Sequence, residues 1–364
     1  MRLFNGTAVF GLIILGSLLL SLSAPGLKER GTLPYIVTDL TGCQVDLSGP
    51  AKEAMLFTPS AWHYVTVDET DQNIQAIAAF MTQEIKGELL DHIFPGLSMK
   101  EPVLGQAVAV ARPLSLELVL VAKPDILLNW AHFSHEFLYI KYPGLIQVPA
   151  NFDTSELYGL LGRLTGKNGR VSYLYRRFHE QLAVLSAHLP LRPEKLLTAM
   201  PLNGHLHIMG RNFISVNTNL NRVGLKHIAQ NYDSRQGPLN LEVFLELDPD
   251  FIFLYFHDLS FSVDDVYTHP VLGSLKASRM RQVYRLPKGT SRLEGPVEEP
   301  ILAAWLSKIA YPEMSEPVSL REQIKNTYHE FFGYEMTQEE IDHMLQMKEN
   351  RGSANYEQFV AAQK

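Results

Sequence analysis

Aromatic and histidine side chains gather in three short segments, each of which follows an apolar stretch typical of a β-strand. The segments are residues 59–64, 130–133 and 255–258, and their candidate ligand-binding residues are Trp62, His63, Tyr64, Trp130, His132, Tyr255 and His257. In open α/β sheets, ligands bind outside the carboxyl ends of the strands. Large rings with a few polar groups are typical of a cleft that stacks on a flat or bulky ligand. We therefore predict that these segments line a ligand-binding cleft.

The sequence lacks the common catalytic motifs. It contains no GxxxxGK phosphate loop, no GxGxxG fingerprint, no GxSxG nucleophile elbow and no HExxH zinc motif. A secreted metalloenzyme using His132, His257 and Asp258 is an alternative, but it needs ligands that converge around an open coordination position, and the loops do not show that spacing. We therefore predict that the chain is not an enzyme, has no resident cofactor and holds no dedicated metal site.

An internal repeat predicts the elements that position these segments. Residues 114–128 (LSLELVLVAKPDILL) recur as residues 239–253 (LNLEVFLELDPDFIF), with an offset of 125 at every matched position. Each copy begins with a helix-capping residue, Ser115 or Asn240, and then has a short helix, a Pro-Asp break and an apolar strand. A helix that leads into a buried strand is typical of parallel α/β structure. Two copies predict two similar α/β lobes.

The segment between the copies has the spacing of a long helix. Apolar residues recur at intervals of four, four and three: Leu174, Phe178, Leu182 and Leu185. Prolines end the pattern at 190 and 193. The predicted fold class is therefore α/β, with two Rossmann-like lobes of mostly parallel sheets joined by one long rigid helix. The predicted boundaries are an N-terminal lobe over 24–167, a linker helix over 168–190, a C-terminal lobe over 191–349 and a polar, frayed tail over 350–364.

The lobes are expected to hold strands and helices at definite places. Strands are predicted near 54–58, 74–79, 125–129 and 144–148 in the first lobe, and near 196–200, 205–209, 250–256 and 282–286 in the second. Helices are predicted near 300–310, 319–331 and 337–347, and the last two begin with the capping patterns SLRE and TQEE. A hairpin is expected around Thr41 and Gly42, with strands on both sides.

The first residues and the composition predict an exported protein. Arg2, an apolar stretch over 9–20 and small residues near 21–24 form the pattern of a signal peptide over 1–23, which is removed on export. We therefore expect a periplasmic protein with no membrane span in its mature form. Cys43 follows a lipobox-like LTG, but it lies far from the apolar stretch, so a lipoprotein is not expected. The 364 residues carry a formal net charge of −7, which does not favour nucleic-acid binding.

Several further stretches, taken in order, resemble one family along almost the whole chain. They are GRLTGK at 162–167, HPVLGSLKA at 269–277, RQVYRLP at 281–287, PILAAWLSKIAYPE at 300–313 and FFGYEMTQEE at 331–340. Together with the doubled Leu-Glu and Pro-Asp repeat, they are similar to periplasmic substrate-binding proteins of ABC importers for iron–siderophore complexes, haem and cobalamin. Those proteins have two lobes joined by one rigid helix, in agreement with the predicted fold.

The resemblance implies a function and a partner. A member of this family captures a metal chelate in the interlobe cleft and delivers it to a permease dimer, which one surface Glu on each lobe contacts. The matching residues here are Glu117 and Glu242, although both are also ordinary first-turn acids of a helix. We expect a monomer with an iron chelate, such as a ferric siderophore, as its ligand; haem, cobalamin or an oxyanion such as molybdate are alternatives.

The family also implies two further cleft segments, 210–213 and 291–294, which contain Arg211 and Arg292. A guanidinium group there could neutralise an anionic chelate or an oxyanion. The histidines of the cleft could instead coordinate iron directly. The sequence leaves these two modes of recognition open.

Overall fold

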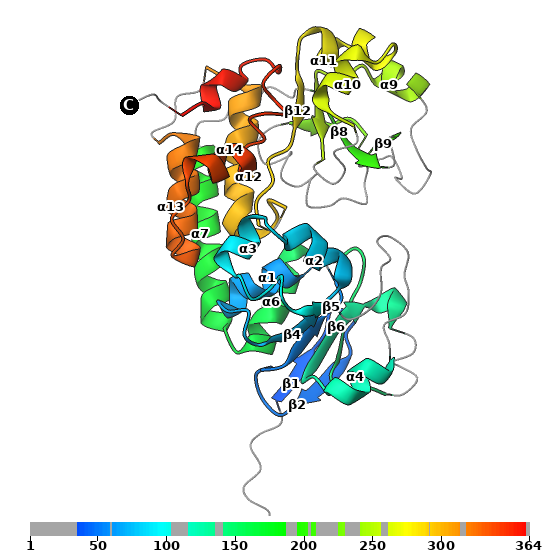
Figure 1. The fold of residues 1–364 in the computed structure, drawn as a ribbon, viewed down its shortest axis with the longest axis vertical. Coiled ribbons are helices and arrows are strands. Elements are labelled where there is room, and N and C mark those ends of the chain that lie inside the picture. Colours follow the sequence, from blue (N-terminus) through cyan, green and yellow to red (C-terminus); the bar gives the residue numbers. More distant parts are fainter. Residues whose placement is uncertain are drawn as a thin grey trace, which may run out of the picture. The chain divides into compact units, whose positions relative to one another are not determined.

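The computed structural model describes residues 35–58, 60–102, 116–134, 141–186, 195–202, 205–208, 225–229, 241–255, 261–290, 292–313 and 318–361. Within them the chain forms two α/β lobes and a group of longer helices that packs beside both (Figure 1). The predicted signal peptide, Ser115, Asn240, Arg211 and His257 lie outside the described residues.

The N-terminal lobe is built on a five-stranded parallel sheet. Its strands lie in the order β5 (Glu101–Pro102), β4 (Ile74–Ile77), β3 (Ala54–Leu56), β6 (Ile126–Trp130) and β7 (Leu145–Val148). The strands β3 and β7 are buried along their whole length, as apolar strands of a parallel sheet covered on both faces must be. All four strands predicted for this lobe are present.

Helices and a hairpin complete the first lobe. The helices are α1 (Ala61–Asp68), α2 (Ala79–Ile85), α3 (Leu89–Ile93), α4 (Leu116–Ala122) and α6 (Thr154–Thr165). The predicted hairpin pairs β1 (Tyr35–Thr38) with β2 (Gln44–Leu47). Its turn is closed by the Asp39 carboxylate, which accepts hydrogen bonds at 2.9 Å from the backbone N–H groups of Thr41 and Cys43. Cys43 is an exposed free thiol within this turn.

The C-terminal lobe has a second mostly parallel sheet. Its strands lie in the order β10 (Lys226–His227), β8 (Lys195–Leu202), β11 (Phe251–Leu254) and β12 (Val283–Arg285), and β9 (His205–Ile208) runs antiparallel to β8. The described helices of this lobe include α9 (Leu241–Leu247), α10 (Val263–Thr268) and α11 (Lys276–Arg279). The four strands predicted from the sequence are present, and the two-residue β10 was not predicted.

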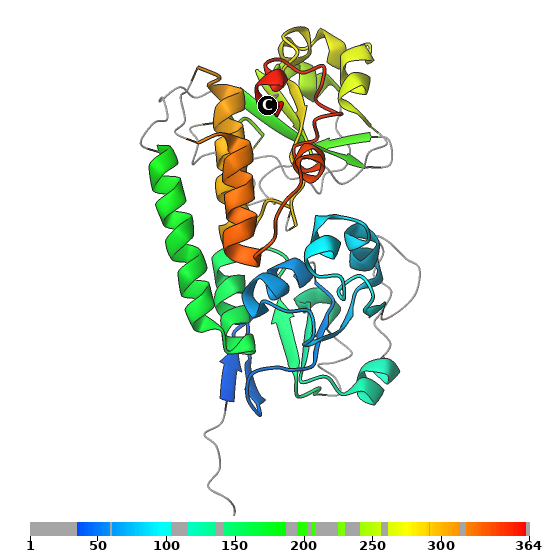
Figure 2. The same cartoon turned by 60° about the vertical axis from the view of Figure 1, so that its left-hand side comes forward.

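The long helix α7 (Asn168–Ser186) connects the cores of the two lobes. Leu174 belongs to the buried core of the first lobe, whereas Leu182 and Leu185 pack against the core of the second. Beside α7 lie α12 (Gly295–Ala310), which packs against it, and α13 (Leu320–Phe332), which packs against α12 (Figures 1 and 2). Arg177 of α7 donates to both carboxylate oxygens of Glu330 at 2.6 and 2.9 Å. The linker helix α7 is therefore packed against α12 and bonded to α13 along its side.

The sequence repeat is a structural repeat. Val119 of α4 and Phe244 of α9 are both buried, and each accepts a hydrogen bond from the residue four positions later, Lys123 or Asp248. Lys123 and Asp248 both have positive φ, at 49° and 32°, and each is followed by the Pro-Asp break and a parallel strand. The two copies therefore share the same buried position, the same helix end and the same connection to the sheet.

The C-terminal segment differs from its prediction. Residues 350–360 are packed against the second lobe, with Tyr356 and Phe359 buried in its core. The Trp305 indole N–H donates to the Tyr356 hydroxyl at 3.1 Å, and Asn350 exchanges hydrogen bonds with the backbone of Arg285. The expected frayed tail was wrong because two aromatic side chains bury enough apolar surface to fix a polar segment. The last described α-helix, α14 (Gln338–Met344), begins with the predicted capping box at Thr337.

No helix of the described residues is long and apolar enough to cross a membrane.

Candidate functional site

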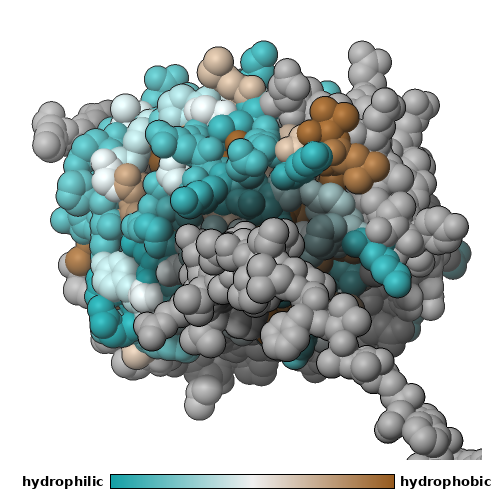
Figure 3. Space-filling view, turned by 90° about the horizontal axis from the view of Figure 1, so that it is seen from below, coloured by the Kyte–Doolittle hydropathy of each residue, from teal (hydrophilic) through white to brown (hydrophobic). Residues whose placement is uncertain are grey.

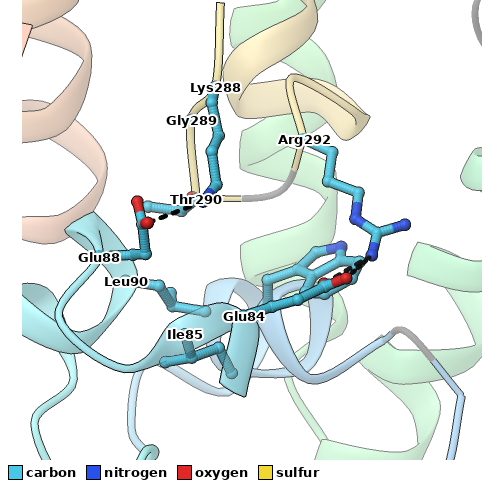
Figure 4. A pocket seen from close by; sticks show the side chains of 9 residues that line it. Glu84, Ile85, Glu88, Leu90, Lys288, Gly289, Thr290 and Arg292 are labelled. Carbon is cyan, nitrogen blue, oxygen red and sulfur yellow. Dashed lines mark hydrogen bonds and ion pairs between the residues drawn. The ribbon is translucent and has the colours of Figure 1, made fainter. Parts of the chain in front are cut away.

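A pocket lies between the two lobes and contains two of the predicted ligand-binding residues. We call it the interlobe pocket, and its lining residues are Trp62, Glu84, Ile85, Glu88, Leu90, Lys288, Gly289, Thr290 and Arg292. The first five come from α1, α2, α3 and the turn between α2 and α3, and the last four from the loop between β12 and α12 (Figure 4). Its volume is about 70 Å³, well below the roughly 300 Å³ of small ligand sites.

Trp62 supplies an aromatic wall with an unused donor. Its side chain is 3% exposed, yet it lines the pocket. Among the residues that the structure describes, the buried indole Nε1 has no hydrogen-bond partner. A buried N–H without a partner is destabilising by about 1–3 kcal/mol and is rare in folded proteins. This indole is therefore suited to donate to an acceptor atom of a ligand.

Arg292 and Glu84 form an ion pair across the pocket. The NH2 nitrogen of Arg292 lies 2.8 and 2.6 Å from the two carboxylate oxygens of Glu84, as Figure 4 shows. The guanidinium carbon of Arg292 also lies 4.8 Å from the ring centre of Trp62, within the range of a cation–π contact. The arginine is thus placed against an aromatic face and is engaged by a carboxylate of the opposite lobe.

The backbone that carries Arg292 has an unusual conformation. Arg292 and Leu293 both have positive φ, at 59° and 56°, and Gly295 follows at 82°. Two successive non-glycine residues in the left-handed region cost of order 1–3 kcal/mol each and persist only when their surroundings fix them. Such strain is concentrated at functional sites, and here it directs the Arg292 side chain into the pocket.

Buried carboxylates of α12 hold this strained loop. The Glu298 side chain accepts hydrogen bonds from the backbone N–H and the hydroxyl of Thr290 at 2.6 and 2.7 Å, and from the Leu293 N–H at 3.2 Å. Tyr328 of α13 also donates to Glu298. Glu299 accepts from the Gly295 N–H at 3.1 Å. Glu298 is therefore a positioning residue for the loop that carries Arg292.

A second group of charges joins the lobes beside the first. Glu88 accepts from Lys288 at 2.9 Å and lies 3.1 Å from the His343 Nε2 of α14. These partners lower the pKa of Glu88 to about 2, with the hydrogen bond to His343 as the main cause. The same contact raises the pKa of His343. Two cations of the C-terminal lobe, Arg292 and Lys288, are thus both held by carboxylates of the N-terminal lobe.

Tyr255 and Glu294 lie behind Arg292. Tyr255 is buried at the end of β11, and its hydroxyl is 3.5 Å from a Glu294 carboxylate oxygen. Burial raises the pKa of Glu294 to about 7, and the nearby Arg292 opposes this shift. The carboxyl group therefore titrates near neutral pH, so the charge behind Arg292 depends on pH.

The sequence of the chain matches one known protein family. The family model described as Periplasmic binding protein matches residues 108–290. The chain belongs to this family. The match covers half of the chain and includes both copies of the internal repeat. No curated protein matches it by sequence.

Solved structures share the two-lobe fold of this periplasmic binding protein. A periplasmic solute-binding protein from Veillonella parvula DSM 2008 is 22% identical, with a TM-score of 0.72, and covers 87% of this chain and 98% of its own. CeuE of Helicobacter pylori in a Ni-His complex is 18% identical, with a TM-score of 0.66 and coverage of 85% and 98%. MolA of Haemophilus influenzae bound to molybdate is 14% identical, with a TM-score of 0.67 and coverage of 83% and 99%. The predicted family and fold are confirmed.

The candidate ligand residues of this periplasmic binding protein fall into different environments. Trp62 and Arg292 line the interlobe pocket, and Tyr255 lies behind Arg292. Trp130 is half-buried at the end of β6, and its ring lies 5.9 Å from that of the exposed His132. The described part of the pocket therefore brings together Trp62, from the predicted segment 59–64, and Arg292, from the segment 291–294 that the family resemblance implies.

The positions of His63 and Tyr64 argue against the predicted direct ligand contacts. Both side chains are at most 1% exposed and belong to the interior of the first lobe. His63 Nδ1 lies 3.1 Å from the Tyr158 hydroxyl, and burial lowers the pKa of His63 to about 3, so its ring is neutral. Residues 61–68 form a helix that is buried on all sides, so only some of its side chains can face the pocket.

The two predicted docking residues lie on equivalent helices. Glu242 is exposed in the first turn of α9, and Glu117 lies at the same repeat position of α4. Both acids therefore lie in the helices that the sequence repeat predicts. Within the described ranges, no group of three His, Cys, Asp or Glu side chains is arranged to hold a metal ion.

Sequence reasoning missed the acidic half of the site. Glu84, Glu88 and Glu298 contact the loop between β12 and α12. Glu84 and Glu298 lie on helices and Glu88 in the turn before α3, and the sequence around each is that of an ordinary surface or capping residue. Lys288 was also missed, although it is four residues from Arg292 in the same loop. That proximity was a usable signal, whereas the pairings of Glu84 with Arg292 and of Glu88 with Lys288 span 200 residues or more and leave no local pattern.

Proposed function

We propose that this protein is a periplasmic receptor that captures an anionic metal chelate, first of all an iron chelate of the ferric siderophore type, between its lobes. It then delivers the chelate to the permease of an ABC importer. The observation that carries the proposal is the placement of Arg292 against Trp62, whose indole N–H has no partner among the described residues. A cation, an aromatic face and a free donor are complementary to a bulky anion with acceptor oxygens.

The cations of the pocket support an anionic ligand. Arg292 and Lys288 both reach the pocket from one loop, and both are neutralised by carboxylates in this structure. A ligand that carries carboxylate or catecholate oxygens can replace Glu84 and Glu88 as the partner of these cations. The exchange keeps each charge paired, which matters because an unpaired buried charge is strongly destabilising.

The size of the pocket implies that the lobes separate to admit a chelate. A volume of about 70 Å³ is too small for a chelate, since small-ligand pockets have roughly 300–1,000 Å³. The ion pairs of Glu84 and Glu88 must therefore break when a ligand of several hundred Å³ enters. We interpret this structure as a form in which the lobes contact each other through their own side chains.

Export and docking complete the proposed role. A signal peptide over 1–23 would direct the protein to the periplasm, and it would act there without a lipid anchor on Cys43. Glu117 and Glu242 would contact basic residues of a two-fold symmetric permease, one on each half. If so, replacing both with Lys abolishes uptake and leaves chelate affinity intact, whereas unchanged uptake would exclude this docking mode.

An oxyanion is the second candidate ligand. MolA, which shares the fold, is bound to molybdate, and the Arg292 site has the charge for a small tetrahedral anion. A small anion would fit a pocket that opens only slightly, whereas a siderophore complex requires wide opening. Haem and cobalamin are larger alternatives that would rely more on Trp62 and Trp130.

The test is an intrinsic fluorescence titration with a ferric catecholate siderophore, a ferric hydroxamate siderophore, haemin, cobalamin and molybdate. We expect one compound to quench the wild-type emission with a saturable curve. The Trp62→Phe variant should lose most of this quenching and bind more weakly, and Trp130→Phe measures the contribution of the second predicted cleft tryptophan separately. Trp305 is fully buried in the C-terminal lobe and supplies a constant background. No response to any compound, together with metal-dependent hydrolysis, would favour the secreted enzyme instead.

A further inference from the structure

The two equivalent helices of the repeat each expose one leucine. Leu120 of α4 is 46% exposed and Leu245 of α9 is 48% exposed, and the two residues occupy the same repeat position. Each follows the buried core residue of its helix, Val119 or Phe244. From this pairing we propose that Leu120 and Leu245 are twin apolar anchors, and that each inserts into one half of the two-fold symmetric permease. The proposal rests on the proposed function and specifies its docking surface.

Folding does not require a leucine at either position. The core contact of each helix is made by Val119 or Phe244, and the next residue points away from the lobe interior. A polar residue would therefore serve equally well for stability, because surface substitutions usually change stability by less than about 0.5 kcal/mol. The same apolar residue at two equivalent exposed positions thus has no explanation within the lobes.

The surface beside the leucines is apolar on α4 and acidic on α9. Val121 lies next to Leu120 and is 77% exposed, and Figure 3 shows an apolar patch at the side of the first lobe where α4 lies. On α9, Leu245 is accompanied by Glu242 and Glu246, both exposed. An apolar centre with acidic neighbours is complementary to an apolar pocket with a basic rim.

The repeat favours a symmetric partner. Figures 1 and 2 both show α4 and α9 on the sides of their lobes that face away from α7. A partner with two identical subunits presents the same pocket twice, so two equivalent leucines on one chain match it. The permease dimer of an ABC importer is such a partner, and this protein belongs to the family that supplies those importers. A second copy of the chain is the competing occupant that the test must separate.

The experiment measures binding to the importer, with its permease and ATPase subunits reconstituted in lipid nanodiscs, without added solute. The variants are Leu120→Asp, Leu245→Asp and the double substitution. The control is Val184→Asp, which changes an apolar residue of α7 that is 56% exposed. We expect each single variant to weaken binding at least ten-fold, the double variant to abolish it, and Val184→Asp to stay within two-fold of the wild type.

Thermal unfolding and light scattering are recorded on the same samples. Melting temperatures within about 2 °C of the wild type show that the leucine variants remain folded. If wild-type protein binds the importer and both leucine variants bind equally well, the anchors are excluded while the proposed function stands. If wild-type protein binds no importer, the proposed function itself fails. A dimer of this chain that dissociates in the variants, with importer binding unchanged, would assign the leucines to self-association and overturn the proposal.

Discussion

The Glu84 carboxylate of the N-terminal lobe holds the Arg292 guanidinium of the C-terminal lobe, with N–O distances of 2.8 and 2.6 Å. Arg292 also packs over the Trp62 ring, so that it contacts both the Glu84 carboxylate and the aromatic wall of the interlobe pocket. The pair joins the two lobes at the pocket. If the ligand is anionic, as we propose, one of its acidic groups would take the place of Glu84, and the pair would compete with the ligand.

Replacing Glu84 with Gln should strengthen the binding of an anionic solute. The substitution keeps the shape of the side chain but removes the charge that neutralises Arg292 and repels an incoming anion. We expect the Kd for molybdate or a ferric catecholate complex, whichever binds the wild type, to fall about three- to ten-fold in a calorimetric titration. Cobalamin, which lacks that excess negative charge, is the control ligand. A weaker affinity in Glu84→Gln would show that Glu84 contacts the ligand favourably instead.

Removing the Glu298 carboxylate should release the loop that carries Arg292. In Glu298→Ala the N–H groups of Thr290 and Leu293 lose their acceptor, and each unsatisfied buried group costs about 1–3 kcal/mol. We expect the free energy of unfolding, measured with urea, to fall by about 2–4 kcal/mol. Tyr328→Phe removes one donor to the same carboxylate and should cost only about 1 kcal/mol. Equal effects of the two variants would contradict the positioning role of Glu298.

The strands and the paired helices were predictable because they depend on local pattern. Val119 and Phe244 occupy the same place in two copies of one motif, and the alternation of helix, Pro-Asp break and apolar strand is a signal within about 15 residues. Trp62 was predicted as a pocket residue because it follows an apolar strand of an α/β sheet. These inferences need no knowledge of distant contacts.

The interlobe contacts were not predictable for the opposite reason. Glu84 and Arg292 lie 208 positions apart in the sequence, and the sequence around each is that of an ordinary surface charge. His63 shows the same limit, since the sequence cannot tell which ring of a buried helix faces the pocket and which packs against Tyr158. The burial of Tyr356 also depends on tertiary packing, so the polar sequence around it did not predict it.

The Glu294 carboxyl should make stability depend on pH. Its pKa in the folded protein is about 7, above the ordinary value of 4.5, so the folded state binds more protons between these two values. Stability due to this group is therefore complete below about pH 4.5 and is lost as the pH rises through 7. The loss amounts to about 3 kcal/mol at most, since one pKa unit corresponds to about 1.4 kcal/mol.

The Glu294→Gln variant tests this dependence. It should match the wild type in urea unfolding at pH 5 and exceed it in stability at pH 8, because its amide cannot become charged. Tyr255→Phe, which removes the hydroxyl 3.5 Å from the carboxyl, should leave the pH dependence in place. Parallel pH curves for wild type and Glu294→Gln would show that Glu294 does not titrate in this range.

The contact between His343 and Glu88 should weaken in alkaline solution. The pKa of His343 is raised by the Glu88 carboxylate, so its stabilising charge is fully present below the ordinary histidine value of 6.5. It is lost as the pH rises through the raised value. We expect the melting temperature of the wild type to fall more than that of His343→Gln between pH 6 and pH 8.5. His329→Gln is the control, since its partner Glu335 lies on the same surface and does not join the lobes.

The central claim is that an anionic solute binds to Arg292 between the lobes. The most direct test is a calorimetric titration of Arg292→Asn with the compound that the fluorescence screen identifies, because asparagine tolerates the positive φ of this position. We predict that the Kd rises at least 100-fold relative to the wild type while the melting temperature stays within a few degrees. Wild-type affinity in a folded Arg292→Asn protein would contradict the claim.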